Sequence, residues 1–282
     1  MSNQPTQNDF IDKNQLKFQI FGVKIGIRFQ KKLCLKEIYN QLERVFPNGF
    51  ETVSGREIEY RFFVKWKKNG EIEIFLNDEK INGNLNEKNY YTTLENQIRL
   101  TIAEFAVGKV FLHAGVIGWK GRAIVIPAQS FAGKTTLVSE LVKKGALYYS
   151  DEYAVLDVEG NVQPFPKWLS LRGIIDPYTQ LDCSVESLGG IAGTETIPVG
   201  MVLIARYHKG KKIPKKWKPR LLSQGQGILE IISHTFPIRN KPDFVLKVLN
   251  KLTDRAIIIK TVRGEADEFA ETLLNYFEYQ TE

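Results

Sequence analysis

Apolar and polar residues alternate with two different periods along the first 107 residues of the chain. A period of two predicts strands, and a period near 3.6 predicts helices. The predicted strands are 17–28, 58–66 and 71–76, and the predicted helices are 35–45 and 92–107. Asn69-Gly70, between two of these strands, favours the left-handed dihedrals of a tight hairpin turn. We therefore expect a small α+β domain over residues 17–107, preceded by a polar, disordered tail over 1–16.

Beyond residue 107, predicted strands alternate with predicted helices. The strands are 110–118, 122–127, 146–149, 153–158, 161–165, 199–207 and 256–262, and the helices are 134–144, 225–233, 242–252 and 266–277. Such alternation is typical of an α/β domain. A hairpin signature at Glu159-Gly160 adds antiparallel pairing. The pattern thus predicts an α/β domain with a mixed sheet over residues 108–282.

The composition excludes several classes of protein. Of 282 residues, 43% are hydrophobic and 25% are charged, so the chain is able to bury a core and is neither disordered nor collagen-like. Cys34 and Cys183, with three histidines, provide neither a disulfide framework nor a zinc site. The polar N-terminus does not resemble a signal peptide, and no apolar stretch approaches the roughly 20 residues of a spanning helix. We expect a soluble, cytoplasmic protein without a membrane partner.

The net charge of +7 comes from one segment. Residues 208–220 hold seven lysines and arginines and no acid, and without these seven the chain has 32 basic and 32 acidic residues. Gly210, Pro214 and Pro219 predict a loop or an irregular hairpin there. Three interpretations stay open: a solvated charged loop, a segment that closes over a nucleotide or holds an acidic protein substrate, and a nucleic-acid site with Trp217 as a stacking residue. Nucleic acid is disfavoured because the rest of the chain is neutral.

Residues 124–137 read Ile-Val-Ile-Pro-Ala-Gln-Ser-Phe-Ala-Gly-Lys-Thr-Thr-Leu. They match the phosphate-loop pattern G-x-x-x-x-G-K-[ST], except that Ala128 replaces the first glycine. A strand before the loop and a helix after it are the context that the motif requires, since the N–H groups of a helix N-terminus bind phosphate. Lys134 would neutralise the β- and γ-phosphates of ATP, and Thr135 would offer its hydroxyl to Mg²⁺. The predicted nucleotide-binding residues are Ala128, Gln129, Ser130, Phe131, Ala132, Gly133, Lys134, Thr135 and Thr136.

A longer pattern surrounds this loop. His113 lies 21 residues before Lys134 within Val110–Val116, and Asp151 lies 17 residues after it within Tyr148-Tyr149-Ser150-Asp151-Glu152. In these features the chain resembles the HPr serine kinase/phosphorylase family and its HPr-kinase-like relatives, whose sheet is shared with phosphoenolpyruvate carboxykinases. The resemblance covers about residues 108–280. It implies a P-loop kinase domain of the HPr kinase/PEP carboxykinase type.

The resemblance also implies roles for individual residues. Asp151 would be the catalytic base, and Asp151 and Glu152 would join Thr135 at the metal, although the family usually has aspartate at the second position. The sequence independently places Asp151 at the end of a buried strand next to the strand that leads into the loop, where its carboxylate would reach Mg²⁺ or an acceptor hydroxyl. His113 would orient the nucleophile or the γ-phosphate. The alternative for His113 is a core histidine bound to a backbone carbonyl.

A third element of the resemblance is Arg172-Gly173. HPr kinases carry a glutamate two residues before this arginine, where the present chain has Ser170, and this departure affects metal binding and the reverse phosphorolysis reaction. Arg172 is expected to hold a phosphate because a guanidinium offers a rigid fork of donors. Lys167 is a second candidate, and a surface salt bridge is the alternative for both.

Together these inferences predict an ATP-dependent kinase that phosphorylates a hydroxyl, on a serine of a peptide or protein or on a small-molecule alcohol. Residues 17–107 resemble the short front region of HPr-kinase-like proteins, not the regulatory domain of HPr kinases, so HPr itself is not the expected acceptor. A non-catalytic nucleotide-binding regulatory or scaffold module is the alternative. Carboxykinase-like decarboxylation is disfavoured because a convincing set of metal ligands and substrate arginines is missing. The sequence leaves a homo-oligomer open.

Overall fold

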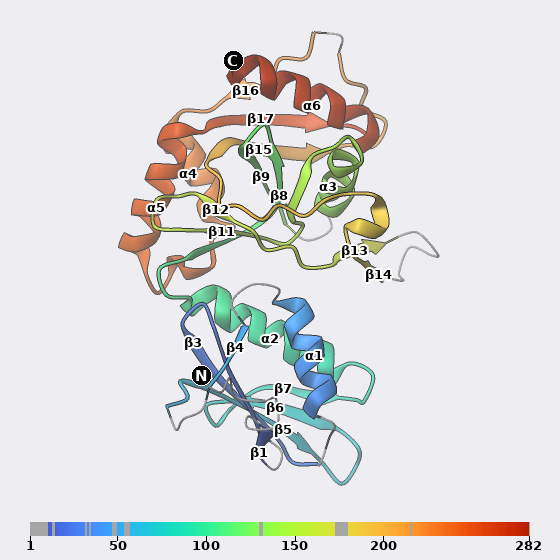
Figure 1. Cartoon of the computed structure of the whole chain (residues 1–282), viewed down its shortest axis with the longest axis vertical. Coiled ribbons are helices and arrows are strands. Elements are labelled where there is room, and N and C mark those ends of the chain that lie inside the picture. Colours follow the sequence, from blue (N-terminus) through green and yellow to red (C-terminus); the bar gives the residue numbers. More distant parts are fainter. Residues whose placement is uncertain are drawn as a thin grey trace, which may run out of the picture. The chain divides into compact units, whose positions relative to one another are not determined.

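The computed structural model describes residues 11–12, 15–31, 33, 35–46, 50–53, 57–129, 132–172, 180–214 and 216–281. The chain divides into two compact units, Met1–Val107 and Gly108–Glu282, shown in Figure 1. Each unit combines helices with a mixed sheet, so the fold class is mixed α/β. Among the described helices, none is both long enough and apolar enough to cross a membrane.

The first unit contains a seven-stranded sheet in the order β1-β2-β3-β5-β6-β7, with β4 beside β2. Its strands are β1 (Ile11–Asp12), β2 (Gln15–Ile20), β3 (Val23–Phe29), β4 (Phe50–Thr52), β5 (Tyr60–Trp66), β6 (Ile72–Leu76) and β7 (Glu79–Leu85), and its helices are α1 (Leu35–Val45) and α2 (Tyr90–Phe105). β3 and β5 run parallel. Alternate residues of the strands, such as Phe18 and Ile25, are buried together with the apolar faces of α1 and α2.

Two predictions for this unit were wrong, and the short strand β4 was missed, as was β7. The strand predicted over 17–28 is a hairpin, because Phe21 and Gly22 adopt φ values of 48° and 79° and reverse the chain between β2 and β3. A left-handed phenylalanine is uncommon, so composition did not indicate this turn. The tail expected to be disordered over 1–16 already forms strand at Ile11–Asp12 and from Gln15 onward, and residues 1–10 lie outside the described part.

The second unit contains an eight-stranded mixed sheet in the order β12-β11-β8-β9-β15-β17-β16, with β10 also beside β8. Its strands are β8 (Val110–Trp119), β9 (Arg122–Pro127), β10 (Leu147–Ser150), β11 (Tyr153–Leu156), β12 (Val162–Gln163), β15 (Val199–Tyr207), β16 (Arg220–Leu221) and β17 (Ile257–Arg263). β13 (Leu169–Arg172) and β14 (Gln180–Cys183) form a separate pair. β9, β15 and β17 are parallel, and the remaining described pairs are antiparallel.

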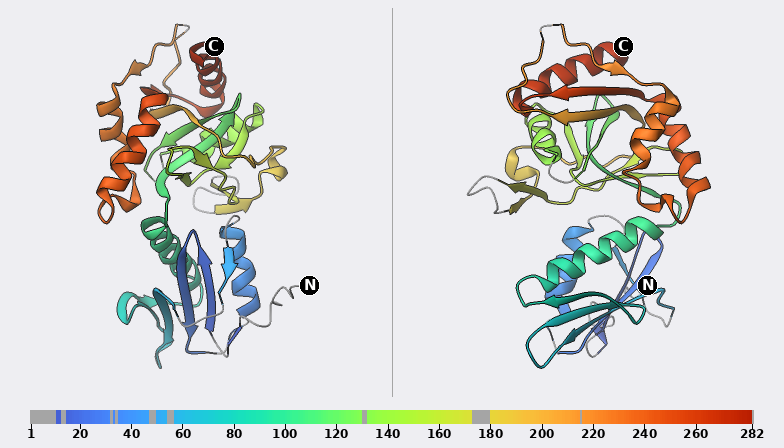
Figure 2. Two further views of the ribbon diagram at one scale, coloured as in Figure 1. Left: turned by 60° about the vertical axis from the view of Figure 1, so that its left-hand side comes forward. Right: turned by 180° about the vertical axis from the view of Figure 1, so that it is seen from behind.

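Two pairs of helices cover the two faces of this sheet, as Figure 2 shows. On one face, α3 (Lys134–Lys143) and α6 (Ala266–Thr281) pack against residues such as Ile124 and Ile126 of β9. On the other face, α4 (Gln224–Ile232) and α5 (Pro242–Arg255) pack against Ala123 and Val125 of the same strand. The helices predicted in this half of the sequence are therefore confirmed. Successive residues of β9 point to opposite faces of the sheet. Because helices bury both faces, every position of the strand is apolar from Ala123 onward.

The parallel strands bring three chain segments to one edge of the sheet. The phosphate loop follows β9, the basic segment follows β15, and Arg263 is the last residue of β17. The carboxyl ends of parallel strands lie at the same edge, which is where ligands bind in open α/β sheets. One expectation needs correction: β10, which leads to Asp151, is not next to β9, because β8 pairs with both and lies between them.

Candidate functional site

The predicted phosphate loop leads from β9 directly into helix α3. Gly133 is the N-terminal cap of α3 and has a φ of 76°, a left-handed conformation that favours glycine. Ala128 is not among the described residues with positive φ, so alanine is accommodated where the motif has its first glycine. Gln129 and Thr136 are exposed. Ser130 and Phe131, which were also predicted to bind nucleotide, lie outside the described residues.

Lys134 is buried at the first turn of α3, with 8% of its surface exposed. Its ammonium donates to the carbonyl oxygens of Ala128 at 2.7 Å and Gln129 at 3.0 Å, and it lies 3.1 Å from Nε2 of His113. Burial lowers the pKa of Lys134 to about 8, against the opposing effect of the Glu152 and Asp151 carboxylates. An ammonium has three protons, and these three contacts use all of them. A bound phosphate would therefore replace at least one carbonyl partner.

The turn between β10 and β11 presents the predicted acidic pair. Ser150 is buried, and its hydroxyl oxygen accepts from the backbone N–H groups of Glu152 at 3.1 Å and Tyr153 at 3.0 Å. Serine closes such turns readily because its side chain replaces a backbone acceptor. The N–H of Ala114 donates to the carbonyl of Glu152 at 3.0 Å and attaches the turn to β8. These hydrogen bonds fix the backbone of the turn, so the carboxylates of Asp151 and Glu152 remain available for other contacts.

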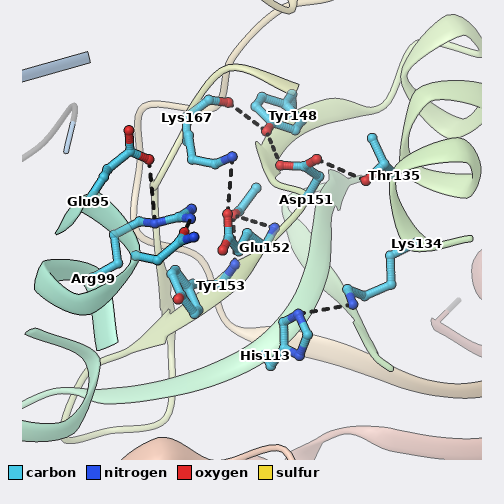
Figure 3. A network of polar contacts seen from close by, with 12 residues as sticks. Glu95, Arg99, His113, Lys134, Thr135, Tyr148, Asp151, Glu152, Tyr153 and Lys167 are labelled. Carbon is cyan, nitrogen blue, oxygen red and sulfur yellow. Dashed lines mark hydrogen bonds and ion pairs between the residues drawn. The ribbon is translucent and has the colours of Figure 1, made fainter. Parts of the chain in front are cut away.

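Asp151 faces the first turn of α3, as Figure 3 shows. The hydroxyl of Thr135 donates to Oδ2 of Asp151 at 3.0 Å, and the Asp151 side chain is buried. The hydroxyl of Tyr148 lies 3.1 Å from Oδ1 of Asp151 and 2.7 Å from the carbonyl oxygen of Lys167, and its single proton serves one of them at a time. Burial, and then the Asp151 charge, raise the pKa of Tyr148 well above its usual range. The structure thus brings Asp151 to Thr135, although β8 lies between β10, which leads to Asp151, and β9, which leads to the helix of Thr135.

Glu152 points to a different partner from Asp151. Its carboxylate forms an ion pair with Lys167 at 3.1 Å, and both side chains are largely buried. The alternative that we left open for Lys167, a salt bridge, therefore describes its contact, although the pair is not a surface one. Among the described residues, no group of three or more histidine, cysteine, aspartate or glutamate side chains could hold a metal. Thr135 and Asp151 still bring two oxygen donors together, and the metal role of Glu152 stays a prediction.

Two histidines lie close to Lys134. The half-buried ring of His113 projects from β8, and its Nε2 lies 3.1 Å from the Lys134 ammonium, from which it accepts in the tautomer that is protonated on Nδ1. The backbone N–H of His113 donates to the carbonyl of His234 at 2.8 Å. Burial and the positive charge of Lys134 lower the pKa of His234. His234 follows the C-terminal cap of α4 and lies within the electrostatic influence of Lys134.

Arg263 is a site residue that we did not predict. It is buried, with 4% of its surface exposed, and its guanidinium donates to the carbonyls of Gly133 at 3.0 Å and Gly264 at 2.9 Å. It also lies 5.2 Å from the ring centre of Tyr207. No carboxylate in the described part of the chain comes within 4.0 Å of it. Its position in the sequence could have indicated this role. Arg263 directly follows the strand predicted over 256–262, and a charged residue at the carboxyl end of a parallel strand lies at the ligand-binding edge of an α/β sheet.

Arg172, the predicted phosphate clamp, is the last residue of β13. Its side chain and residues 173–179 lie outside the described part of the structure, so its role stays a prediction.

Comparison with known proteins adds no further assignment. No family model matches this chain, and no curated protein sequence matches it significantly.

Proposed function

We propose that this protein is an ATP-dependent phosphotransferase that transfers the γ-phosphoryl group of Mg·ATP to a serine hydroxyl of a peptide or protein. The observation that carries the proposal is the hydrogen bond between Thr135 and Asp151 at 3.0 Å, at the N-terminus of the helix that follows the phosphate loop. From this place the Asp151 carboxylate would reach both a metal ion and an acceptor hydroxyl, as phosphoryl transfer requires.

The described residues support a division of roles in the transfer. The acceptor oxygen forms a bond to the γ-phosphorus while the bond from that phosphorus to the β,γ-bridging oxygen breaks, and ADP leaves. Asp151 accepts the proton that the hydroxyl loses. Lys134 and Arg263, which are both buried cations beside the loop, balance the charge that spreads over the phosphate oxygens. His113 positions the Lys134 ammonium through Nε2, which makes it a positioning residue.

The donor set fits Mg²⁺. This ion prefers oxygen ligands and takes one or two from the protein, with phosphate oxygens and water completing its shell. The hydroxyl of Thr135 and the carboxylate of Asp151 supply such a pair. When bound, the ion would shield the phosphate charge and hold the β- and γ-phosphates in position.

The strand order and the spacing of His113, Lys134 and Asp151 support a phosphate-loop kinase of the HPr kinase/PEP carboxykinase type. The fold alone does not specify the acceptor. The choice of a serine hydroxyl rests on the resemblance described above.

A transfer assay with the full chain tests the proposal. Wild-type protein is incubated with γ-labelled ATP, Mg²⁺ and an extract of the source cells, and phosphoserine is identified in the products by mass spectrometry. Asp151→Asn removes the base and should lower transfer at least a hundredfold, whereas Mg·ATP affinity should fall by less, because Thr135 and Lys134 remain to hold the ion and the phosphates. Asp254→Asn, at an exposed position on α5, is the matched control and should retain full activity.

Two results would contradict the proposal. Equal turnover by Asp151→Asn and wild type would remove Asp151 from the reaction. Tight Mg·ATP binding without labelled product from any extract fraction would instead favour the nucleotide-binding regulatory or scaffold module.

A further inference from the structure

The basic segment, residues 208–220, is fixed to the body of the second unit by Trp217. The indole N–H donates to Oγ1 of Thr261 on β17 at 3.2 Å. The indole ring meets the rings of Phe269 and Tyr276 on α6 edge-on, with centres 5.3 Å and 5.1 Å apart. Phe269 is fully buried in the core. Trp217 therefore attaches the described part of the segment to β17 and α6, a contact that a solvated charged loop would not need.

The charges of the basic segment differ from those elsewhere in the protein. Many other lysines pair with a carboxylate, as Lys67 does with Glu73 and Lys260 with Glu230. By contrast, the described cations of the basic segment have no carboxylate of the described chain within 4.0 Å; they are Lys209, Lys211, Lys212, Lys216, Lys218 and Arg220. Trp217 thus holds these cations near α6, and none of the described carboxylates forms an ion pair with them.

A pocket of about 590 Å³ lies between the basic segment and α6. Lys212, Lys216 and Trp217 line it from the segment, and Glu268, Thr272 and Tyr276 line it from the helix. We call it the basic pocket. Its volume is within the range of ligand sites, and it combines an aromatic wall with cations. Such a lining suits a ligand that has an apolar group and negative charges side by side.

We propose that the basic pocket binds an acidic peptide segment that carries an aromatic or aliphatic side chain, and that this segment belongs to the phosphate acceptor. The apolar side chain would pack against Trp217 and Tyr276, and neighbouring carboxylates would pair with Lys212 and Lys216. Glu268 disfavours a ligand that is anionic throughout, such as a nucleic-acid backbone. Outside the segment the chain has 32 basic and 32 acidic residues, so the excess of positive charge that a long polyanion would need is confined to this segment.

The acceptor role rests on the proposed function and on the position of the segment. A Cβ atom built on Gly264 would lie 1.8 Å from the carbonyl oxygen of Lys211, so the segment passes directly over this glycine. The preceding residue, Arg263, contacts Gly133 in the phosphate loop. A peptide held in the basic pocket therefore has its adjoining residues at the edge of the sheet where transfer would take place.

Peptide binding by the full chain tests the site without any phosphoryl transfer. A fluorescein-labelled peptide of glutamates around one phenylalanine, without hydroxyl residues, is titrated and followed by anisotropy. Replacing the phenylalanine by alanine, or the glutamates by glutamine, should weaken binding about tenfold or more. Single-stranded DNA of equal charge and phosphatidylserine vesicles should bind more weakly than the peptide. Stronger binding of either, or equal binding of the glutamine peptide, would overturn the proposal.

Charge variants localise the binding. Lys212→Glu/Lys216→Glu should lower peptide affinity at least tenfold. The control Lys88→Glu/Lys247→Glu makes the same charge change at exposed lysines elsewhere and should leave affinity within about twofold. Glu268→Gln removes a repulsive charge and should tighten binding a few-fold, a gain that a structural role would not produce. An equal loss of peptide affinity in the control variant would mean that only the net charge of the protein matters, and it would overturn the assignment of the binding site to the basic pocket.

The failures of the two proposals are distinguishable. Lys134→Ala should strongly weaken Mg·ATP binding and leave peptide affinity unchanged, because Lys134 does not line the basic pocket. Peptide binding without transfer would refute the kinase and leave the pocket in place. Transfer with an unchanged acceptor KM in Lys212→Glu/Lys216→Glu would refute the acceptor role of the pocket and leave the kinase in place.

Discussion

The guanidinium of Arg263 donates to the carbonyl oxygen of Gly133 at 3.0 Å, although the two residues are 130 positions apart in sequence. Arg263 lies at the end of β17 and Gly133 caps helix α3. Burial lowers the pKa of Arg263 against the opposing effects of Tyr207 and Glu265, and no described carboxylate lies within 4.0 Å of the guanidinium. Since burying a cation without a close ion pair is costly, a nucleotide phosphate bound as we propose would stabilise the charge of Arg263.

Arg263→Gln should weaken Mg·ATP binding about tenfold to a hundredfold, because a charged donor to the loop and to the phosphates is lost. The melting temperature should change little, since removing an unpaired buried charge offsets the lost hydrogen bonds. Calorimetric titration with Mg·ATP and a thermal melt give both quantities. Arg206→Gln, at an exposed position on the neighbouring strand β15, is the control. Unchanged affinity in Arg263→Gln would show that Arg263 has no role in nucleotide binding.

Gly133→Ala should destabilise the loop more than a comparable substitution elsewhere. A Cβ atom there would lie 2.7 Å from Nη2 of Arg263, and φ is 76°. Gly121 has a φ of 75° with no neighbour within 4 Å, so Gly121→Ala causes backbone strain alone, about 1 kcal/mol. Urea denaturation should show a larger loss for Gly133→Ala, and nucleotide affinity should fall in that variant only. Equal losses in the two variants would contradict a close contact between Arg263 and the loop.

Tyr148→Phe should shift the pH profile of transfer. The phenol contacts Oδ1 of Asp151, and a donor to a carboxylate favours its charged form. Its removal should move the acid limb of kcat to higher pH. Tyr149→Phe is a matched control in the next residue, because that hydroxyl donates to the carbonyl of Glu195 at 2.8 Å. Each variant should lose about 1 kcal/mol of stability. A shift of the acid limb in both, or in neither, would disprove the role of Tyr148.

Nucleotide binding should take up a proton in alkaline solution. The pKa of Lys134 is lowered to about 8 in the free protein, so above this pH the amine is largely neutral. Phosphate favours the ammonium and raises that pKa, and binding at pH 9 should therefore be accompanied by uptake of up to one proton, with little uptake at pH 6.5. Affinity should fall as pH rises above 8. Calorimetry in buffers with different ionisation enthalpies measures the uptake.

Lys134→Met should bind Mg·ATP weakly and take up no proton at either pH. Proton uptake at pH 9 that persists in this variant would assign the effect to another group.

Short-range sequence patterns predicted most helices and strands, and they predicted the site residues that lie in contiguous motifs, but not Arg263. The Gly-Lys-Thr motif and the Asp151 turn are contiguous patterns, and the structure brings Lys134 to His113 and Thr135 to Asp151. Turns made by unusual residues escaped prediction. Phe21 adopts a left-handed conformation that its side chain disfavours, and no short-range pattern indicated it.

Contacts that depend on the order of strands in the sheet could not be predicted from the sequence. The placement of Arg263 beside Gly133 requires β9, β15 and β17 to be adjacent and parallel, with a given register. Likewise, the seating of Trp217 on Phe269 depends on the path by which the chain returns from β15 to β17. The pattern of apolar residues identifies each strand but not its neighbours. For this reason the sequence indicated the basic segment through its charge, but it did not predict the contacts by which Trp217 holds the segment.

The order of β9 and β17 along the chain has a consequence for biosynthesis. The phosphate loop follows β9, whereas Arg263 lies on β17, which is translated later. A nascent chain that stops before residue 263 contains the complete phosphate-loop motif but lacks the arginine that holds Gly133. Strand pairings between distant segments form late because their loops must close first. If the protein binds nucleotide as we propose, full affinity should therefore arise only after β17 has left the ribosome and paired with β15.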